Sequence, residues 1–150
     1  MGLKSRIFPA LLIIAAVLLY AFYPTDRKRI KMVIEKSAVA IMQENIDQLM
    51  EHISFNYKDL YGGNYLILRK RMEQTFKRYD DLEISAEVMK VTVKEDQAVA
   101  GLKMSVIGSE GSGRGYVIGS AEGDEEIDVY MEKSPYEWKV TKVEMGASNN

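Results

Sequence analysis

The chain has 150 residues, with 20 basic and 22 acidic side chains, one histidine and no cysteine. This length suits a single domain with one core, and the lack of cysteine excludes disulfides, lipidated cysteines and thiolate metal sites. Five of the basic residues and one of the acidic residues lie within 1–29, which leaves residues 30–150 with a net charge of −6. Such an acidic domain disfavours nucleic-acid binding, which needs a concentrated positive surface. With one histidine, no metal site or cofactor is predicted.

The most distinctive segment is an uncharged, largely apolar run from Ile7 to Tyr23. As a helix it would span roughly 25 Å, slightly less than the hydrocarbon core of a bilayer. Its end, Tyr20 to Tyr23, lacks the small residues of a signal-peptide cleavage site. We therefore predict that residues 1–25 form an uncleaved signal anchor with a short basic tail, and that residues 7–23 lie in the bilayer.

The cations that follow this run, Arg27, Lys28, Arg29 and Lys31, are predicted to contact anionic lipid headgroups. Counting positive charges on the two sides of the run favours a cytoplasmic domain. A short basic tail before one apolar helix is, in contrast, typical of an anchor that exports the following domain. We favour a single-pass protein with its domain outside the cytoplasm, in the periplasm, and both orientations remain open.

Helical periodicity dominates the first half of the remaining chain. Apolar residues spaced by three and four predict a helix that starts at Thr25 or Asp26 and ends near Met42. Asn45 then marks a break before a short second helix over 46–53. A turn at Leu60 to Asn64 precedes a third helix, predicted over roughly 65–80.

Alternating patterns follow, and they predict strands. The first strand starts near Leu82, and its apolar phase changes between Val88 and Met89, which indicates a β-bulge because a one-residue shift moves side chains to the other face. A hairpin is expected at Lys94 to Asp96, and the Gly/Ser segment 108–115 is predicted to be a flexible hairpin tip. Further strands are predicted over 98–106, 116–121, 127–131 and, with a second phase change, 138–145.

Helices followed by antiparallel strands indicate an α+β fold. The order of elements resembles the nuclear transport factor 2-like superfamily, the SnoaL-like and ketosteroid-isomerase-like cone. The matching segments are the helix break Glu44–Asp47, the hairpin Val91–Ala100 and the closing strand Trp138–Glu144. The resemblance implies three N-terminal helices packed on a strongly curved antiparallel sheet over 26–145. A disordered tail is expected over 146–150.

A membrane helix joined to such a cone also resembles the VirB8-like scaffold subunits of type IV secretion channels. Enzymes of the cone superfamily work inside the cone mouth, with an Asp or His as the base. The weak candidates here are Tyr57, Asp59 and His52, and for each a structural role is the more frequent explanation. No catalytic constellation is therefore predicted.

The positions expected to point into the cone are apolar and include no pair of catalytic groups, so they are candidates for a ligand pocket, although cores use the same residue types. These pocket residues are Leu102, Met104, Tyr116, Ile118 and Trp138.

Three roles follow, in decreasing order of preference. The first is a non-catalytic interaction or scaffold module of a cell-envelope assembly, which binds a protein partner or forms a homodimer through the sheet face. The second is a binder of an apolar small molecule or lipid in the cone. The third is a SnoaL-like isomerase or dehydratase. A deep apolar cavity would favour the binder, and converging polar groups within it would favour the enzyme.

Overall fold

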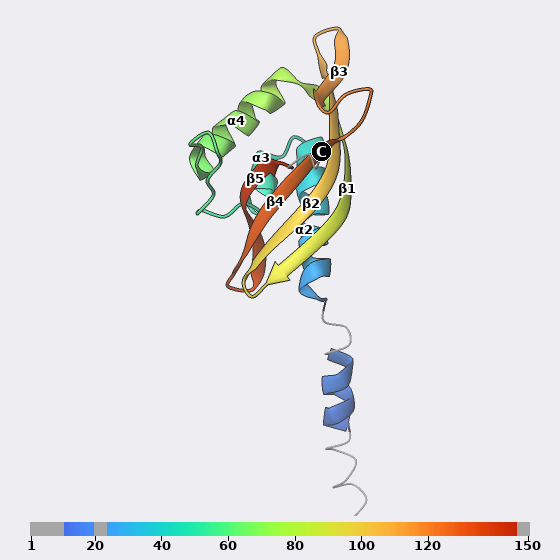
Figure 1. Ribbon diagram of the computed structural model, residues 1–150, viewed down its shortest axis with the longest axis vertical. Coiled ribbons are helices and arrows are strands. Elements are labelled where there is room, and N and C mark those ends of the chain that lie inside the picture. The colour runs from blue at the N-terminus through green and yellow to red at the C-terminus, as the bar shows by residue number, and fades with distance from the viewer. Residues whose placement is uncertain (1–10, 20–23, 147–150) are drawn as a thin grey trace, which may run out of the picture.

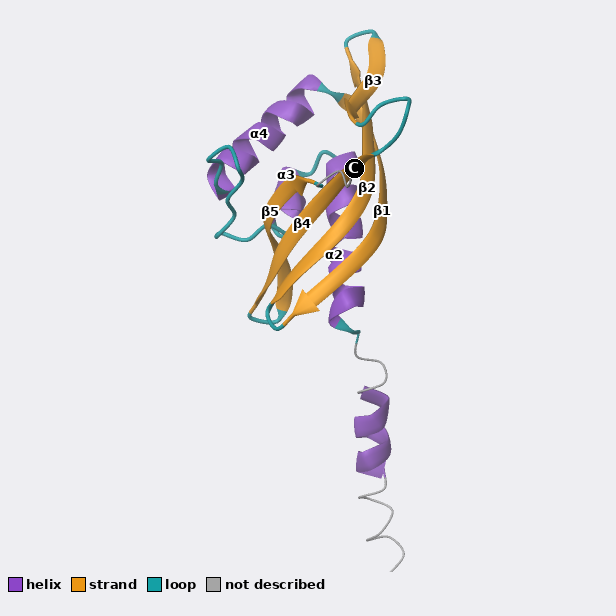
Figure 2. Cartoon of the chain, in the orientation of Figure 1, coloured by secondary structure: helices purple, strands orange, loops and turns teal. Residues whose placement is uncertain are grey.

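The computed structural model describes residues 11–19 and 24–146 (Figure 1). Residues 11–19 are helical, and three further helices follow: α2 (Asp26–Met42), α3 (Ile46–Met50) and α4 (Tyr65–Arg78). The strands come after the helices, as Figure 2 shows, which confirms the α+β class. The strands are β1 (Asp80–Lys94), β2 (Gln97–Glu110), β3 (Gly113–Ile118), β4 (Glu125–Ser134) and β5 (Glu137–Met145).

The helices begin where the sequence predicts, because a polar side chain caps each of them. Thr25 Oγ1 accepts the Lys28 N–H at 3.4 Å at the start of α2. Asn45 and Asn64 cap α3 and α4 in the same way through their side-chain oxygens. These caps satisfy N–H groups that have no partner inside a helix. The prediction for the second helix was too long, since α3 ends at Met50.

The strands form one antiparallel sheet in the order β1-β2-β4-β5, and β3 pairs with the outer end of β2. The register between β1 and β2 shifts between Val88 and Lys90, so Met89 is the extra residue of a bulge, as predicted. A second shift leaves Thr141 unmatched in β5, at the second predicted phase change. Bulges bend the strands that carry them, and they account for the strong curvature of the sheet (Figure 2).

The hairpin tip predicted over 108–115 is present, but the prediction made it too long. β2 and β3 stay paired up to Glu110 and Gly113, so the turn itself is very short. Gly111 makes this turn possible with a positive φ of 59°. Gly108 is buried in the pairing, where a Cβ atom would lie 2.9 Å from the Leu82 side chain. Glycines here allow close strand contact instead of a loose loop.

The segment between α3 and α4 lines the free edge of β5, a pairing that the sequence did not predict. Ile53 forms a parallel bridge with Val140. The Ser54 N–H donates to the Val140 carbonyl at 2.8 Å, and the Lys58 N–H donates to the Thr141 carbonyl at 3.0 Å. These bonds cover the edge of the sheet and fix the path of the chain into α4.

The core lies between α2 and the inner face of the sheet. Ile30 is fully buried there, and Trp138 is 2% exposed. The Trp138 indole N–H donates to Asp26 Oδ1 at 3.1 Å, and Lys133 forms an ion pair with the same carboxylate. These contacts close one end of the cone around the start of α2.

The two ends of the domain differ. The β1–β2 and β4–β5 turns lie beside the start of α2, whereas β3 and the last turns of α4 lie at the opposite end (Figure 1). Two hydrogen bonds join the parts of the first end, from the Arg29 side chain to the Tyr136 carbonyl and from the Lys133 N–H to the Asp96 carbonyl. We call the end at the start of α2 the closed end and the other the open end.

Within residues 11–19 and 24–146, no helix has the length and apolar character needed to cross a membrane. The predicted span 7–23 is described only over 11–19, and its remaining residues lie outside the described part of the chain. Of the predicted tail, Gly146 is described and donates its N–H to the Glu126 carbonyl.

Candidate functional site

Helix α4 forms a roof at the open end, and it has no fully buried side chain. Tyr65, Leu68, Met72 and Phe76 recur on one side of the helix and are only partly buried. In a helix that packs directly on a sheet, a stripe with this spacing would be covered. Its partial exposure indicates that α4 stands over a space that the domain does not fill.

Ion pairs hold this roof in place. Arg69 contacts Asp47 of α3 at 2.5 Å, and Arg78 contacts Glu110 of β2 at 2.8 Å. Such exposed pairs contribute at most about 1 kcal/mol each, so they position α4 without binding it tightly.

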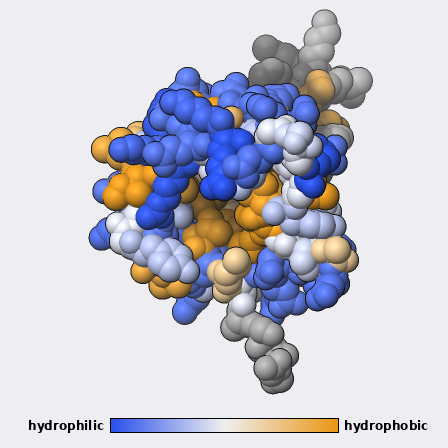
Figure 3. All heavy atoms as spheres, turned by 90° about the horizontal axis from the view of Figure 1, so that it is seen from above, coloured by the Kyte–Doolittle hydropathy of each residue, from blue (hydrophilic) through white to orange (hydrophobic). Residues whose placement is uncertain are grey.

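Viewed from the open end, the surface is hollowed, and the floor of the hollow is apolar while most of the surface around it is hydrophilic (Figure 3). Partly buried apolar residues of the helices and the sheet also pack against the core. They include Ile46 in α3, Tyr65 and Leu68 in α4, Met104 in β2 and Ile118 in β3.

The predicted pocket residues fall into two groups. Met104 and Ile118 are partly buried at the border of the core, and Tyr116 is 47% exposed on β3. Leu102 and Trp138 are core residues, with 5% and 2% exposure. Trp138 directly follows the β4–β5 turn and therefore packs at the closed end, away from the hollow.

Asp59 has a structural role in the turn before α4. Its Oδ1 accepts the N–H groups of Tyr61 and Gly63 at 2.9 and 2.7 Å, and its Oδ2 accepts from Arg71 at 2.7 Å. The Gly63 N–H, with further help from Tyr61 and Arg71, holds the pKa of Asp59 below its usual value. A carboxylate with these partners is a poor general base.

Tyr57 and His52 do not join Asp59 in a catalytic arrangement. Tyr57 is buried, and burial raises the pKa of its phenol. His52 is half-buried in a separate groove, where burial, Lys36 and Lys139 lower the pKa of its imidazole. Neither Tyr57 nor Asp59 lines that groove. His52 is thus separated from Tyr57 and Asp59, which lie near each other in the segment before α4.

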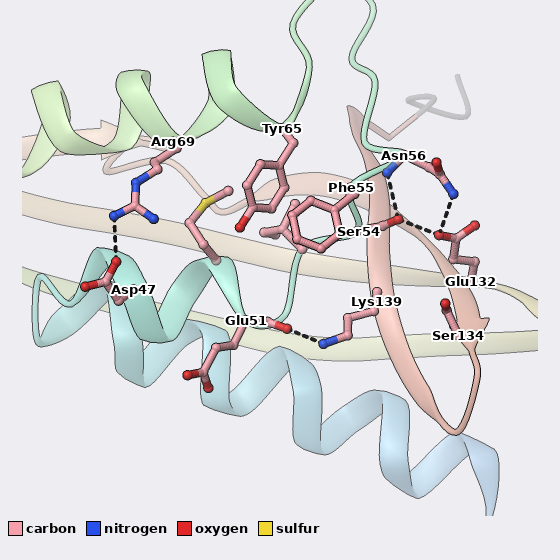
Figure 4. Close-up of a pocket in the computed structure, with 12 residues that line it drawn as sticks. Asp47, Glu51, Ser54, Phe55, Asn56, Tyr65, Arg69, Glu132, Ser134 and Lys139 are labelled. Carbon is pink, nitrogen blue, oxygen red and sulfur yellow. Dashed lines mark hydrogen bonds and ion pairs between the residues drawn. The ribbon is translucent and has the colours of Figure 1, made fainter.

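A cleft of about 390 Å³ lies beside the first turn of α4 (Figure 4). Ser54 and Asn56 both donate side-chain hydrogen bonds to Glu132 across the cleft, the Asn56 bond at 3.2 Å. The rings of Phe55 and Tyr65 face each other with centroids 4.7 Å apart. The sequence analysis did not predict this cleft, because it depends on the pairing of residues 53–58 with β5.

Other charged groups of the cleft also have partners within the protein. Lys139 Nζ donates to the Glu51 carbonyl at 2.6 Å, and Arg69 is shared between Asp47 and Glu73 (Figure 4). The cleft therefore has a polar network at the start of α4, in which Glu132, Lys139 and Arg69 each have a partner within the protein.

Large apolar side chains are exposed around the start of α4. Phe55 and Tyr61 are each 85% exposed, and Leu60 and Leu66 are each 71% exposed. We call these four residues the apolar rim. Sequence periodicity did not reveal them, because they lie in a non-repetitive segment or outside the stripe of α4.

The outer face of the sheet has a different character. Tyr130 on β4 hydrogen-bonds Glu144, and Lys142 lies 4.2 Å from the centre of the Tyr130 ring. The neighbouring Lys103 and Asp128 are also charged. This charged face, which the sequence analysis considered for dimerisation, is less apolar than the region around α4.

No protein-family model and no curated protein matches the sequence. Solved structures match the fold. A candidate scytalone dehydratase from Novosphingobium aromaticivorans is similar with a TM-score of 0.69 and 11% identity, over 80% of this chain and 82% of that one. A protein of the nuclear transport factor 2-like family from Streptomyces avermitilis has a TM-score of 0.66 and 8% identity, over 79% and 93%.

Bd1075 from Bdellovibrio bacteriovorus is similar with a TM-score of 0.62 and 15% identity over 83% of this chain. The match spans only 41% of the Bd1075 chain, so it concerns one part of that protein. At these identities the similarity establishes the fold and not an activity. The domain has the nuclear transport factor 2-like α+β fold, with a curved antiparallel sheet and a few helices.

Proposed function

We propose that this protein is a membrane-tethered, non-catalytic binding module that takes up an apolar segment of a partner protein at its open end. The observation that carries this proposal is the apolar rim, four exposed apolar side chains around the start of the helix that stands over the hollow. Exposed apolar groups that cluster in one place are typical of protein interfaces.

The rim favours a protein over a small molecule as the occupant. A small apolar ligand would be enclosed in the hollow and would leave Phe55 and Tyr61 in water. A protein segment that lies across the start of α4 would cover these side chains as well as the hollow. Tyrosine is enriched among the residues that carry most of the binding energy of protein interfaces, which makes Tyr61 a suitable anchor for such contact.

The hydrogen bonds and locations of the best acid–base candidates support a non-catalytic role. Asp59 is saturated with hydrogen bonds in a turn, and His52 lies in another groove. The activity named for the Novosphingobium neighbour belongs to that protein, because 11% identity transfers no site.

The tether and the compartment are proposed from the sequence. The apolar run 7–23 provides the anchor, and the short basic tail before it favours export of the domain. The resemblance to VirB8-like scaffold subunits agrees with a place in an envelope assembly.

Site-specific photocrosslinking in cell membranes tests this proposal. A photoreactive amino acid replaces Tyr61 or Leu66 in the full chain, and the matched control replaces Lys103 on the outer sheet face. We expect one discrete protein adduct from the two rim positions and none from the control. The adduct should disappear from position 61 when Leu66→Asp is also present.

Equal adducts from the rim and the control, or none from the rim, would contradict a docking site at α4. An adduct with twice the mass of the chain would identify a second copy and would exclude a different partner.

An apolar small molecule in the hollow is the second candidate, favoured by the partly exposed stripe of α4. The hollow is seen on the face opposite the start of α2 (Figure 3), so a lipid of the proposed anchoring bilayer would have to travel the length of the domain to enter. Native mass spectrometry of the purified chain would detect such a ligand as an added mass that Met104→Arg removes.

A further inference from the structure

A groove runs between the first turns of α2 and the outer edge of β1, with a volume of about 680 Å³. Its helix side is formed by residues 25–31 and its strand side by residues 88–93. It lies toward the closed end of the domain, where α2 begins (Figure 1). It is separate from the hollow and the cleft described above.

Four cations line this groove: Arg27, Lys28, Lys31 and Lys90. All four are exposed, and none of them forms an ion pair with another described residue. No acidic side chain lines the groove. In a domain whose residues 30–150 carry a net charge of −6, this concentration of unneutralised positive charge calls for an anionic ligand.

The strand side of the groove is largely apolar. Val88, Met89, Val91 and Val93 contribute to it, and the β-bulge turns out Met89, which is 55% exposed. The groove thus combines a cationic side with an apolar side. A phospholipid has the same two parts, an anionic headgroup joined to apolar chains.

The position of the groove points to a lipid as the source of the negative charge. Pro24 and the first turn of α2 directly follow the apolar run that ends at Tyr23. The chain from residue 19 to residue 24 can extend at most about 18 Å. The groove therefore lies within reach of the headgroup layer that surrounds the anchor.

Arg29 belongs to a different surface, although the sequence analysis grouped it with the other cations. Its side chain donates to the Tyr136 carbonyl and lines the groove that contains His52. Lys90, which is distant in sequence, is the fourth cation of the groove because β1 lies beside α2.

We propose that this groove binds the headgroup of an anionic phospholipid through Arg27, Lys28, Lys31 and Lys90. The inference rests on the tether in the proposed function. Occupancy would hold the closed end against the bilayer and direct the apolar rim and hollow toward partners in solution.

Native mass spectrometry of the full chain in mild detergent tests the proposal. The chain is mixed with equimolar phosphatidylglycerol and phosphatidylcholine, and the retained lipids are counted. We expect the chain to retain at least about tenfold more phosphatidylglycerol than phosphatidylcholine. Each basic residue near an anionic surface contributes about 1 kcal/mol to binding, so several of them are sufficient for this ratio. The triple variant R27Q/K28Q/K31Q should lose this preference.

The matched control K70Q/K77Q/K103Q removes the same charge from exposed lysines that lie outside the groove, and it should keep the preference. Fluorescence of Trp138 checks that both variants are folded. An equal loss in both variants, or no preference in the unaltered chain, would overturn the proposal. Displacement of the lipid by millimolar inorganic phosphate would also overturn it, because a free anion would then suffice.

Each of the two proposals can be contradicted without affecting the test of the other. A negative crosslinking result at α4 does not alter the lipid ratio measured here, and the lipid ratio does not depend on a protein partner.

Discussion

Trp138 is the only tryptophan in the chain, and its environment links the sheet to the start of α2. Its N–H donates to Asp26, which also pairs with Lys133. The sequence analysis assigned Trp138 to the ligand pocket because alternation in the last strand pointed it inward. Alternation shows which face of the sheet a side chain lies on, but it does not show how far along the cone the side chain lies. Trp138 does face inward, but at the closed end.

Replacing Asp26 tests this contact. Asp26→Ala leaves the buried indole N–H without an acceptor, and we expect a loss of about 1–3 kcal/mol in the free energy of unfolding. Asp26→Asn keeps an oxygen acceptor and should lose clearly less. Urea denaturation of the full chain in detergent, followed by Trp138 fluorescence, measures both. Equal losses in the two variants would show that the hydrogen bond is unimportant.

The same carboxylate predicts a pH dependence. The Trp138 hydrogen bond, followed by that of Lys133, lowers the pKa of Asp26 in the folded state. Ionised Asp26 therefore adds stability above its unfolded pKa of about 3.9, and this stability is lost as the pH falls through the lower folded pKa. The difference in unfolding free energy between the unaltered chain and Asp26→Asn should be constant near neutral pH and shrink below about pH 4. A difference that grows in acid would contradict this assignment.

Gly63 illustrates a constraint that only the structure reveals. A Cβ atom on Gly63 would lie 2.3 Å from Asp59 Oδ2, so Gly63→Ala must displace the carboxylate that holds the turn before α4. We expect a loss of about 1–3 kcal/mol by the same urea assay. Gly115→Ala is the control, since a Cβ there meets nothing within 4 Å, and it should be close to neutral. A neutral Gly63→Ala would rule out the proposed turn geometry.

Among the elements, α2 and α4 differ in how they are held. Ile30, Ile34 and Ala40 bury one side of α2 in the core, whereas α4 has no fully buried side chain and is held by ion pairs near its ends. Both helices were predicted from their periodicity. The pattern did not reveal that the apolar stripe of α4 is left partly uncovered.

Hydrogen exchange should report this difference. We expect the backbone amides of the middle of α4 to exchange at least about tenfold faster than those of the middle of α2, because opening α4 disrupts little packing. Mass spectrometry of peptides from the two helices measures the rates. Binding of the partner should slow the exchange of α4 selectively. Similar protection of both helices in the free protein would contradict a loosely held roof.

The bulges in β1 and β5 were predictable because each changes the apolar phase of its strand, as Val88 and Met89 do in β1. The pairing of residues 53–58 with β5 was not. Ile53 and Val140 are far apart in the sequence, and no local pattern signals a parallel bridge between such distant segments. The cleft beside α4 and the position of the apolar rim depend on that bridge, so neither could be predicted from local sequence patterns.

For the whole molecule, the order of helices and strands was enough to predict the α+β cone, because the change from helical to alternating periodicity is sharp at Leu82. The site was less predictable. Met104 and Ile118, which were predicted to line a pocket, are partly buried against the core, while the groove between α2 and β1 needs the tertiary contact that brings Lys90 and Lys31 into one groove. A cluster of cations from two distant segments is invisible to a linear search.

These observations lead to a directional account of the molecule. The basic groove lies toward the closed end, where the proposed anchor would join the domain, and the hollow lies at the open end, under the helix α4, around whose start the apolar rim lies. The central claim is that the closed end faces the bilayer while the binding surface faces away from it.

Single-cysteine labelling tests this claim directly, since the chain has no cysteine of its own. Tyr136→Cys places a fluorophore at the closed end, and Ser112→Cys places one at the tip of the β2–β3 turn, both at exposed positions. The labelled full chains are reconstituted in nanodiscs that contain lipids with a quencher on the headgroup. The account predicts several-fold stronger quenching at position 136 than at position 112. Equal quenching, or stronger quenching at position 112, would contradict it.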